Sequence, residues 1–377
     1  MKIKPFELER YFARYEFSAP YHLSSSDCEA LSLKELLAMA DEDTLQLWEE
    51  LKLGYTESPG HPLLRKEISK LYQTIEPEQI LVTVPEEGIF IAMNTLLGNG
   101  DHIISTFPAY QSLYEIACSM GCEISKWTPT NDIGWHFKID DLKPLIRRNT
   151  KLIVINFPHN PTGAIISENE LQELLMIARE RNIIVFSDEM YRFLEYNSAH
   201  QTSSASDLYE NAISLFGMSK SFALAGLRIG WLSTKNSDFL KSFAAYKDYT
   251  SICSSAPSEI LAIIALRVKE NILHRNLQLI AKNLKILDKF FAKYEDIFEW
   301  LRPQAGPIAF PKFKPQIDVA DFCLNLVEKN GVMLLPSKVY DFKANYFRIG
   351  FARKNMPEAL DQLEQYLQTH LRGSKRT

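Results

Sequence analysis

Polar side chains that could do chemistry follow two of the β-branched runs in this chain. Asp188 ends the run NIIVFSD, and Tyr191 comes three residues later. Ser219 and Lys220 follow the run AISLFG, and Arg228 lies eight residues beyond the lysine. Ligands of open α/β sheets bind at the carboxyl ends of the strands, so we expect these side chains to meet at one edge of a sheet.

A third run, KLIVIN, adds an amide to this set. It leads into the turn-rich segment NFPHNPTG (156–163), where Asn160 precedes a proline. A lysine amine can bond an aldehyde, and an aspartate can keep a pyridine nitrogen protonated. Tyrosine and asparagine can hydrogen-bond a ring oxygen, and arginine binds phosphate. Pyridoxal 5'-phosphate (PLP) carries all four of these groups, so the set predicts a PLP site.

Seven short runs rich in β-branched residues would position these side chains. They lie at 80–84, 102–106, 122–127, 151–156, 182–187, 212–217 and 227–232. Between them, apolar residues recur at helical spacing over 86–97, 109–120 and 168–181. This alternation is typical of a sheet covered by helices, and it predicts an α/β fold with a mostly parallel, seven-stranded sheet.

The pattern changes after about residue 255. Long helical stretches are followed by short apolar runs at 309–313, 332–336 and 346–351, and then by a final helix. We therefore expect a large PLP-binding domain over residues 51–255 and a smaller α+β domain over 256–377. Residues 1–50 show no strand alternation and are expected to pack with the small domain.

Composition favours a small ligand and a cytoplasmic protein. The 377 residues are 46% hydrophobic and carry a formal net charge of −5, so we expect no broad basic surface for nucleic acid or anionic lipid. The apolar stretch at 259–268 is too short to cross a bilayer, and the N-terminus has no signal-peptide pattern. The five cysteines include no CxxC pair, so reduced thiols and no metal site are expected.

In order and spacing, these motifs resemble those of the fold-type I PLP-dependent aminotransferases, the class I/II enzymes of the aspartate aminotransferase superfamily. The resemblance spans residues 50 to 370, approximately. It implies that Lys220, in MSKSFALAGLRIGW, both holds PLP and serves as the catalytic base. Arg228 and Ser219 would bind the phosphate, and Asp188 and Tyr191, in SDEMY, would bind the ring nitrogen and ring oxygen.

The same resemblance assigns four further residues. Asn160, in NPTG, would lie beside the ring oxygen and the substrate, and Tyr110, in FPAY, would stack on the ring. Arg348, in YFRIGF, would clamp the α-carboxylate of the substrate, a task that suits its planar fork of donors. Tyr55, in GYTESPG, would reach the phosphate of a neighbouring subunit, which implies a homodimer with shared active sites.

The chain departs from the family pattern at two places. The phosphate loop, usually rich in Gly, Ala and Ser or Thr, reads VTVPEEG here, with Pro85, Glu86 and Glu87. Backbone amides at that helix start can still hold phosphate, so Glu86 and Glu87 are expected to bind the cofactor without a catalytic role. The position three before the lysine, often a serine, is Gly217.

The resemblance implies transamination between a small amino acid and a 2-oxo acid. Ser24–Ser26, NFPHNP, AFPKF and GVMLLPSKVY also resemble the subgroup that contains capreomycidine synthase, so elimination or cyclisation after loss of the α-proton is an alternative. A PLP-fold sensor domain of a transcription regulator is disfavoured, because the residues before Tyr55 show no basic recognition helix.

Overall fold

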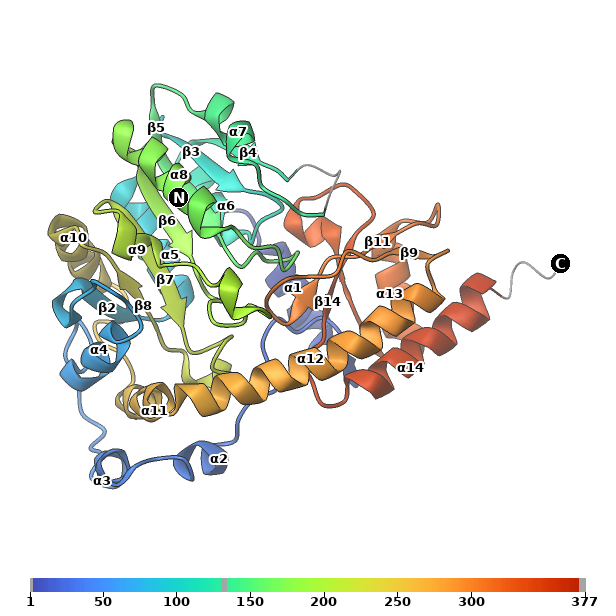
Figure 1. The fold of residues 1–377 in the computed structure, drawn as a ribbon, viewed down its shortest axis with the longest axis horizontal. Helices are drawn as coiled ribbons and strands as arrows, with labels where there is room; N and C mark the ends of the chain where they lie inside the picture. The colour runs from blue at the N-terminus through green and yellow to red at the C-terminus, as the bar shows by residue number, and fades with distance from the viewer. Residues whose placement is uncertain (1–2, 130–133, 373–377) are drawn as a thin grey trace.

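A seven-stranded sheet forms the centre of the larger of two lobes in the computed structural model, which describes residues 3–129 and 134–372 (Figure 1). From one edge to the other, its strands are β2 (Ile80–Thr83), β8 (Gly230–Ser233), β7 (Ala212–Gly217), β6 (Ile184–Asp188), β5 (Thr150–Asn156), β3 (His102–Thr106) and β4 (Glu123–Trp127). Strand β8 pairs antiparallel with both of its neighbours, and every other pair in the sheet is parallel. The predicted α/β fold with a mostly parallel sheet is confirmed.

Helices cover both faces of this sheet. One face packs against α5 (Pro85–Leu96), α6 (Ser112–Ser119) and α10 (Ser237–Lys247). The other packs against α4 (Pro62–Ser69), α7 (Ile139–Leu142), α8 (Glu168–Glu180), α9 (Ala205–Leu208) and α11 (Ala256–Arg267). Alternate residues of β5 enter the two opposite cores, which explains why its sequence reads as a continuous apolar run.

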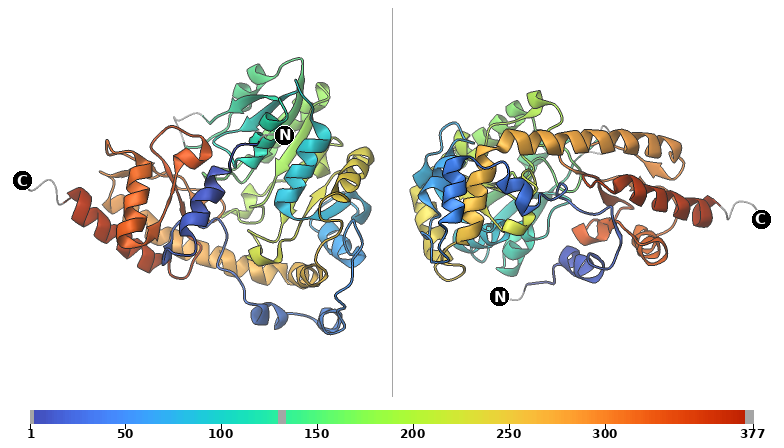
Figure 2. Two further views of the ribbon diagram at one scale, coloured as in Figure 1. Left: turned by 180° about the vertical axis from the view of Figure 1, so that it is seen from behind. Right: turned by 90° about the horizontal axis from the view of Figure 1, so that it is seen from below.

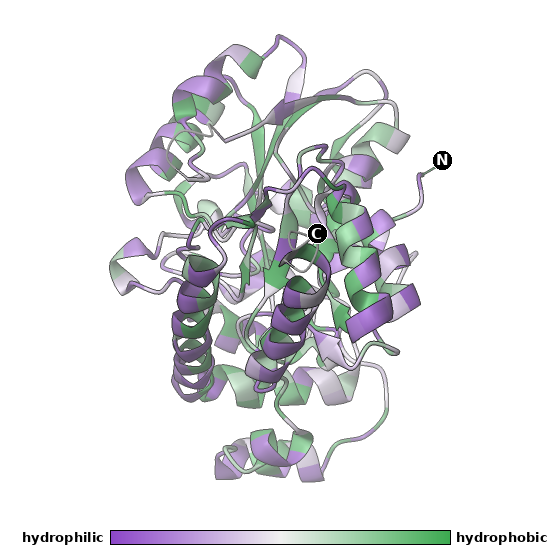
Figure 3. Cartoon of the chain, turned by 90° about the vertical axis from the view of Figure 1, so that its right-hand side faces the viewer, coloured by the Kyte–Doolittle hydropathy of each residue, from purple (hydrophilic) through white to green (hydrophobic). Residues whose placement is uncertain are grey.

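The smaller lobe follows the 25-residue helix α12 (Lys269–Lys293), which runs along one side of both lobes (Figure 1). It contains the short strands β9 (Phe298–Glu299), β10 (Ile308–Ala309), β11 (Lys312–Phe313), β12 (Val332–Met333), β13 (Leu335–Pro336) and β14 (Phe347–Gly350). Helices α13 (Val319–Asn330) and α14 (Met356–Leu367) pack with α12 around one apolar core, and a π-helical turn covers Gln368–Arg372. Surface helices are hydrophilic on one side and hydrophobic on the other in Figure 3.

The first fifty residues divide their contacts between the lobes. Strand β1 (Tyr21–His22) pairs with β12 of the small lobe, and α1 (Glu7–Tyr15) contacts the turn at Ser337–Tyr340. Helices α2 (Leu33–Leu37) and α3 (Glu42–Glu49) instead pack on α11, together with the core that contains Trp231. These contacts favour grouping residues 33–49 with the large lobe.

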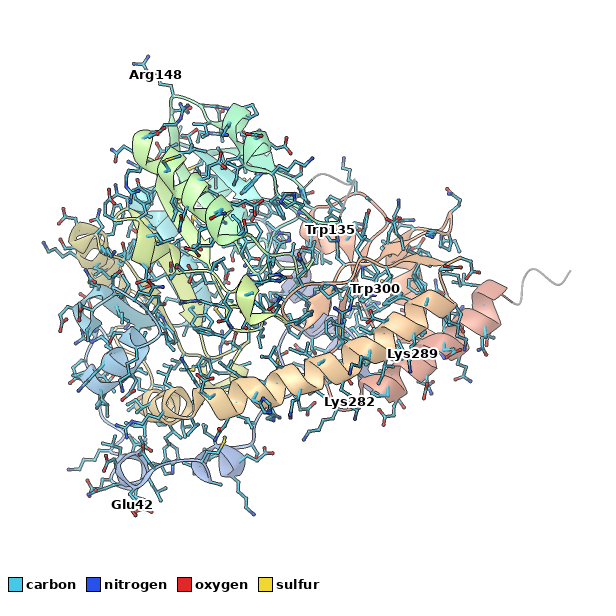
Figure 4. The ribbon with its side chains drawn as sticks, in the orientation of Figure 1. Glu42, Trp135, Arg148, Lys282, Lys289 and Trp300 are labelled. Atoms are coloured by element: carbon cyan, nitrogen blue, oxygen red, sulfur yellow. The ribbon has the colours of Figure 1, made fainter. Side chains whose placement is uncertain are left out.

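Aromatic side chains also connect the lobes. Trp135, labelled in Figure 4, belongs to the large lobe and packs against Phe310 and Tyr346 of the small lobe, with ring centroids 5.6 and 5.0 Å away.

Among the described residues, no helix is both long and apolar enough to span a membrane.

Candidate active site

A cavity of about 380 Å³ lies at the carboxyl ends of β5, β6 and β7, between the two lobes. The sequence-predicted residues that line it are Lys220, Asp188, Tyr191, Asn160, Tyr110, Arg228, Ser219, Glu86 and Arg348. Two predicted residues, Glu87 and Tyr55, lie outside it. The strand ends thus bring together residues that are up to 262 positions apart, from Glu86 to Arg348.

Asp188 ends β6 at the base of the cavity. Its Oδ1 accepts a hydrogen bond from the Met190 amide at 3.1 Å, and Asn156 Nδ2 donates to the Asp188 carbonyl at 3.0 Å. The Asn156 Oδ1 also accepts from the Asn160 amide at 2.8 Å, so this one side chain fixes both the strand end and the following turn. Burial raises the pKa of Asp188 to about 7, although the Met190 amide and the charge of Lys220 oppose the rise.

Lys220 follows β7 and points into the same cavity. Its Nζ donates a hydrogen bond to Ser26 Oγ at 2.7 Å, and burial lowers its pKa. A buried amine with a lowered pKa is unprotonated more often at neutral pH, which makes it a better nucleophile and base.

The unusual phosphate loop is explained by close packing beneath it. A Cβ atom on Gly217 would lie 2.9 Å from Gly230 Cα and 3.1 Å from Pro85 Cγ, and one on Gly230 would lie 2.7 Å from Pro85 Cγ. Strands β7 and β8 and the first residue of α5 therefore meet so closely that only glycine fits on the strands. Pro85 suits the first helical position, where a backbone N–H has no helical partner.

Hydrogen-bond donors for an anion lie where the cavity meets the start of α5. The Ser219 hydroxyl is buried without a hydrogen-bond partner in the described chain, and the free amides of the first turn of α5 lie nearby. Arg228 adopts a left-handed conformation with φ 53°, and its Nη1 donates to the Ala225 carbonyl at 3.1 Å. An unpaired hydroxyl, a guanidinium and helix amides fit a phosphate, and Lys220 with Asp188 fit the aldehyde and ring nitrogen of PLP.

The two glutamates of the loop face different ways. Glu86 lines the cavity, accepts a hydrogen bond from Ser112 Oγ at 3.2 Å, and has its pKa raised to about 7 by burial. Glu87 instead accepts from Thr83 Oγ1 at 2.7 Å and from the Ser251 amide at 3.1 Å. It therefore connects β2 to the loop after α10.

Arg348, on β14 of the small lobe, lines the same cavity as Lys220 and is only 1% exposed. Its Nη1 donates to Tyr340 Oη at 2.6 Å and to Asn160 Oδ1 at 3.2 Å, while Nη2 donates to the Ser24 carbonyl at 2.6 Å. Its Nε has no partner in the described chain. The guanidinium is thus positioned by neutral oxygens, and its charge is left for a ligand.

Two predicted aromatic residues and one histidine have different surroundings. Tyr110 lines the cavity, packs on Phe6 and donates a hydrogen bond to Glu9 at 3.4 Å. His159 is buried against Thr162, and burial lowers its pKa to about 3, which favours a structural role. Tyr55 is 93% exposed and does not reach the cavity of its own chain.

Sequence reasoning missed several residues that shape the cavity. Ser26, Asn156 and Tyr340 hold Lys220, Asn160 and Arg348 respectively, yet none was assigned a role. Residues 1–50 were expected to pack with the small domain, and no role in the site was assigned to them, but α1 lines the cavity with Leu8, Glu9 and Phe12, and its C-cap residue Glu16 lines it too. The three-residue and four-residue spacing of those four positions was the available signal, since it defines one helix face.

Comparison with known proteins agrees with this geometry. The family model for aminotransferase class I and II matches residues 22–363. Capreomycidine synthase from Streptomyces vinaceus is 28% identical over 98% of this chain and 95% of its own length. Glutamate-pyruvate aminotransferase AlaA from Haemophilus influenzae is 29% identical over 83% of this chain and 82% of its own. The crystal structure of a PLP-dependent aminotransferase from Streptococcus suis 89-1591 superposes with a TM-score of 0.91 at 34% identity, covering 98% of this chain and 99% of that one.

The buried carboxyl of Asp188 predicts a pH dependence of stability in the cofactor-free protein. Its folded pKa of about 7 exceeds the usual 3.8, so between these values the folded state keeps a proton that the unfolded chain loses. The free energy of unfolding should therefore fall as pH rises through this window, by up to about 1.4 kcal/mol per pH unit. Asp188→Asn should flatten this slope in urea unfolding between about pH 5 and pH 6.5. The exposed Asp361→Asn serves as the control, and equal slopes for Asp188→Asn and wild type would contradict the assignment.

Proposed function

Because the chain belongs to the class I and II aminotransferases, which makes it a PLP-dependent enzyme, we propose that it transfers amino groups between a small α-amino acid and a 2-oxo acid. The observation that carries this proposal is the position of Lys220, Asp188 and Arg348 around one cavity. A lysine amine, a buried carboxyl and a free guanidinium suit an aldehyde, a pyridine nitrogen and a substrate carboxylate.

PLP, when bound, supplies an aldehyde for the substrate amine and a protonated ring that withdraws electrons from the α-carbon. In the proposal, Lys220 holds the cofactor at rest, and its released amine then removes and returns the substrate α-proton. Its lowered pKa favours the unprotonated form that this role requires. The Asp188 carboxylate would stabilise positive charge on the ring nitrogen, and this would offset the cost of ionising a buried acid.

Arg348 would orient the substrate. Its contacts with Tyr340, Asn160 and Ser24 fix the guanidinium plane, and Nε remains free to donate to a carboxylate oxygen. A carboxylate held in one orientation also fixes the rotation about the α-carbon, so the C–H bond that Lys220 attacks is presented in one direction.

A second candidate function is elimination or cyclisation by the same site. It is favoured by the match to capreomycidine synthase, which extends over 98% of this chain. Removal of the α-proton by Lys220 is common to both candidates, so mass analysis of the products distinguishes them.

We also propose that two copies of the chain share their active sites. An apolar surface next to Tyr55 includes Leu53, Tyr249 and Ile252, which are 86%, 92% and 52% exposed. Its two segments are joined by a hydrogen bond from Thr56 Oγ1 to the Ser254 carbonyl at 3.2 Å. Large exposed apolar side chains that cluster in this way are typical of a protein interface.

The role of Lys220 predicts a single covalent site for the cofactor. Purified protein should be yellow, and borohydride should fix the cofactor to Lys220, as peptide mass mapping will show. Lys220→Ala should bind PLP through Arg228 and the helix amides but should not turn over. Lys247 is the internal control, because it is also buried with a lowered pKa but lies outside the cavity. A label on Lys247, or no label, would contradict the assignment.

The clamp role of Arg348 predicts a selective effect on substrate binding. Arg348→Lys keeps the charge but loses the planar fork, so KM for the amino acid should rise about tenfold to a hundredfold with little change in PLP affinity. The same substitution at the exposed Arg302 (Arg302→Lys) is the control, and it should leave KM and PLP affinity unchanged. If amines without a carboxylate react with the wild type as well as amino acids do, Arg348 has another role.

The shared-site proposal predicts complementation between two inactive variants. If Tyr55 serves the partner's site, a hybrid of Lys220→Ala and Tyr55→Ala subunits has both lesions in one site and leaves the other native. Its activity should therefore exceed that of either parent once subunit exchange is confirmed. A hybrid no more active than the Tyr55→Ala parent, or an active monomer in sedimentation, would exclude shared sites.

A further inference from the structure

Helix α1 covers the side of the cavity that faces away from the sheet. In the left view of Figure 2 it lies, in dark blue, between the orange small lobe and the large lobe. Glu9 and Phe12 lie on α1, and Glu16 is its C-cap residue, which keeps helical backbone angles. Their spacings of three and four residues place them on one side of the helix, and all three line the cavity. This face carries two carboxylates toward the site.

The other charged groups of the cavity are matched if the proposed function holds. Arg228 meets the phosphate, Arg348 meets the substrate carboxylate, and Asp188 meets the ring nitrogen. Asp27 also lines the cavity, but it already forms an ion pair with Arg353 at 2.9 Å. Glu9, Glu16 and Glu86 remain, because none of them forms an ion pair within the described part of the chain. Glu86 lies at the start of α5 and accepts a hydrogen bond from Ser112, so the two carboxylates on the N-terminal side of the cavity are Glu9 and Glu16.

The surroundings of Glu16 make its negative charge unfavourable. The residue is half-buried, and burial raises its pKa, with Glu9 and Asp27 adding to the shift and Arg353 and Lys220 opposing it. Glu9 is exposed, and within the described residues its side chain has only the hydrogen bond from Tyr110 at 3.4 Å. A cation near both carboxylates would relieve the repulsion of Glu16 by Glu9 and the cost of ionising the half-buried Glu16.

The unpaired donors in the same cavity show that the cavity is built for a ligand. Arg348 Nε and Ser219 Oγ are both buried without partners in the residues described. They lie on the sheet and small-lobe walls, so a substrate whose carboxylate binds Arg348 has the acidic face of α1 as another wall of its cavity. Phe12, between the two glutamates, offers an apolar surface for a methylene chain.

We propose that the acidic face of α1 makes the enzyme selective for α-amino acids whose side chain carries a positive charge, an ammonium or a guanidinium group. This inference rests on the proposed function, because it assumes that the α-carboxylate binds Arg348. Glu16 and Glu9 are then specificity-determining residues, and they take no part in the proton transfer.

The test compares amino acids of similar length and different charge. L-Lysine and L-ornithine carry a cation, L-norleucine and L-methionine are neutral, and L-glutamate is anionic. For each, the dissociation constant is measured from the absorbance change of the PLP-loaded enzyme, and kcat/KM is measured separately with 2-oxo acid acceptors. The variants are Glu16→Gln and Glu9→Gln, with Glu7→Gln as the matched control, since Glu7 is exposed on α1 and does not line the cavity.

Wild type should bind the cationic amino acids about tenfold to a hundredfold more tightly than the neutral ones. Glu16→Gln should remove most of this difference and leave the neutral amino acids nearly unchanged, Glu9→Gln should act in the same direction, and Glu7→Gln should have no effect. Circular dichroism shows whether each variant is folded. If one of the two glutamine variants does not fold, the other alone is enough for the test.

The outcomes separate this inference from the proposed function. Neutral or anionic amino acids that bind as tightly as cationic ones would overturn the selectivity while transamination stands. A preference for cations that survives both glutamine variants would overturn the role of α1. Tight, Glu16-dependent binding of cationic amino acids without any amino transfer would support the selectivity and refute the transaminase proposal.

Discussion

The buried guanidinium of Arg348 is the interaction on which the closed cavity depends. Its partners come from three separate parts of the chain: the Ser24 carbonyl from the N-terminal segment, Asn160 from the turn after β5, and Tyr340 from the small lobe. All three are neutral oxygens, so the full positive charge remains in a site that is almost inaccessible to water. Burying an unpaired charge is unfavourable, and an anionic ligand relieves this cost while it completes the wall.

A second constraint is purely steric and connects two departures from the family pattern. Pro85 packs directly over Gly217 and Gly230, where β7 and β8 run side by side. The Cβ of a serine at position 217 would collide with Gly230 Cα and the Ile229 carbonyl oxygen, both at 2.9 Å, and would lie within 3.1 Å of the proline ring. The same close packing therefore accounts for both the proline and the glycine. Under the proposed function, phosphate binding would fall to Ser219, Arg228 and the first turn of α5, which all line the same cavity. Close packing thus decides which side chains are available for chemistry.

The sequence was most informative where function follows from local order along the chain. The seven strands of the large sheet were placed within a few residues, and strand ends alone predicted that Lys220, Asp188 and Asn160 meet. Contacts that depend on tertiary folding could not be found this way. The Lys220 to Ser26 hydrogen bond joins residues 194 positions apart, and no local pattern predicts which lobe the N-terminal helix will cover. The need for glycine at position 350 is another feature that no local pattern predicts. It arises because the Ser25 carbonyl, distant in sequence, lies where a Cβ atom would be.

Helix α12 has a mechanical consequence. It begins at Lys269, and only Val268 separates it from α11, which is packed into the large lobe. Its other end is embedded in the core of the small lobe. Its 25 residues span about 37 Å, so a rotation of about 5° at Val268 would move its far end by about 3 Å. Ser24, Tyr340 and Arg348 would travel together with that end, whereas Lys220, Asp188 and Asn160 would stay with the sheet. Under the proposed function, a rotation of the small lobe away from the large lobe would separate the residues that bind the substrate carboxylate from those that bind the cofactor. The product could then leave while PLP stays bound to the large lobe.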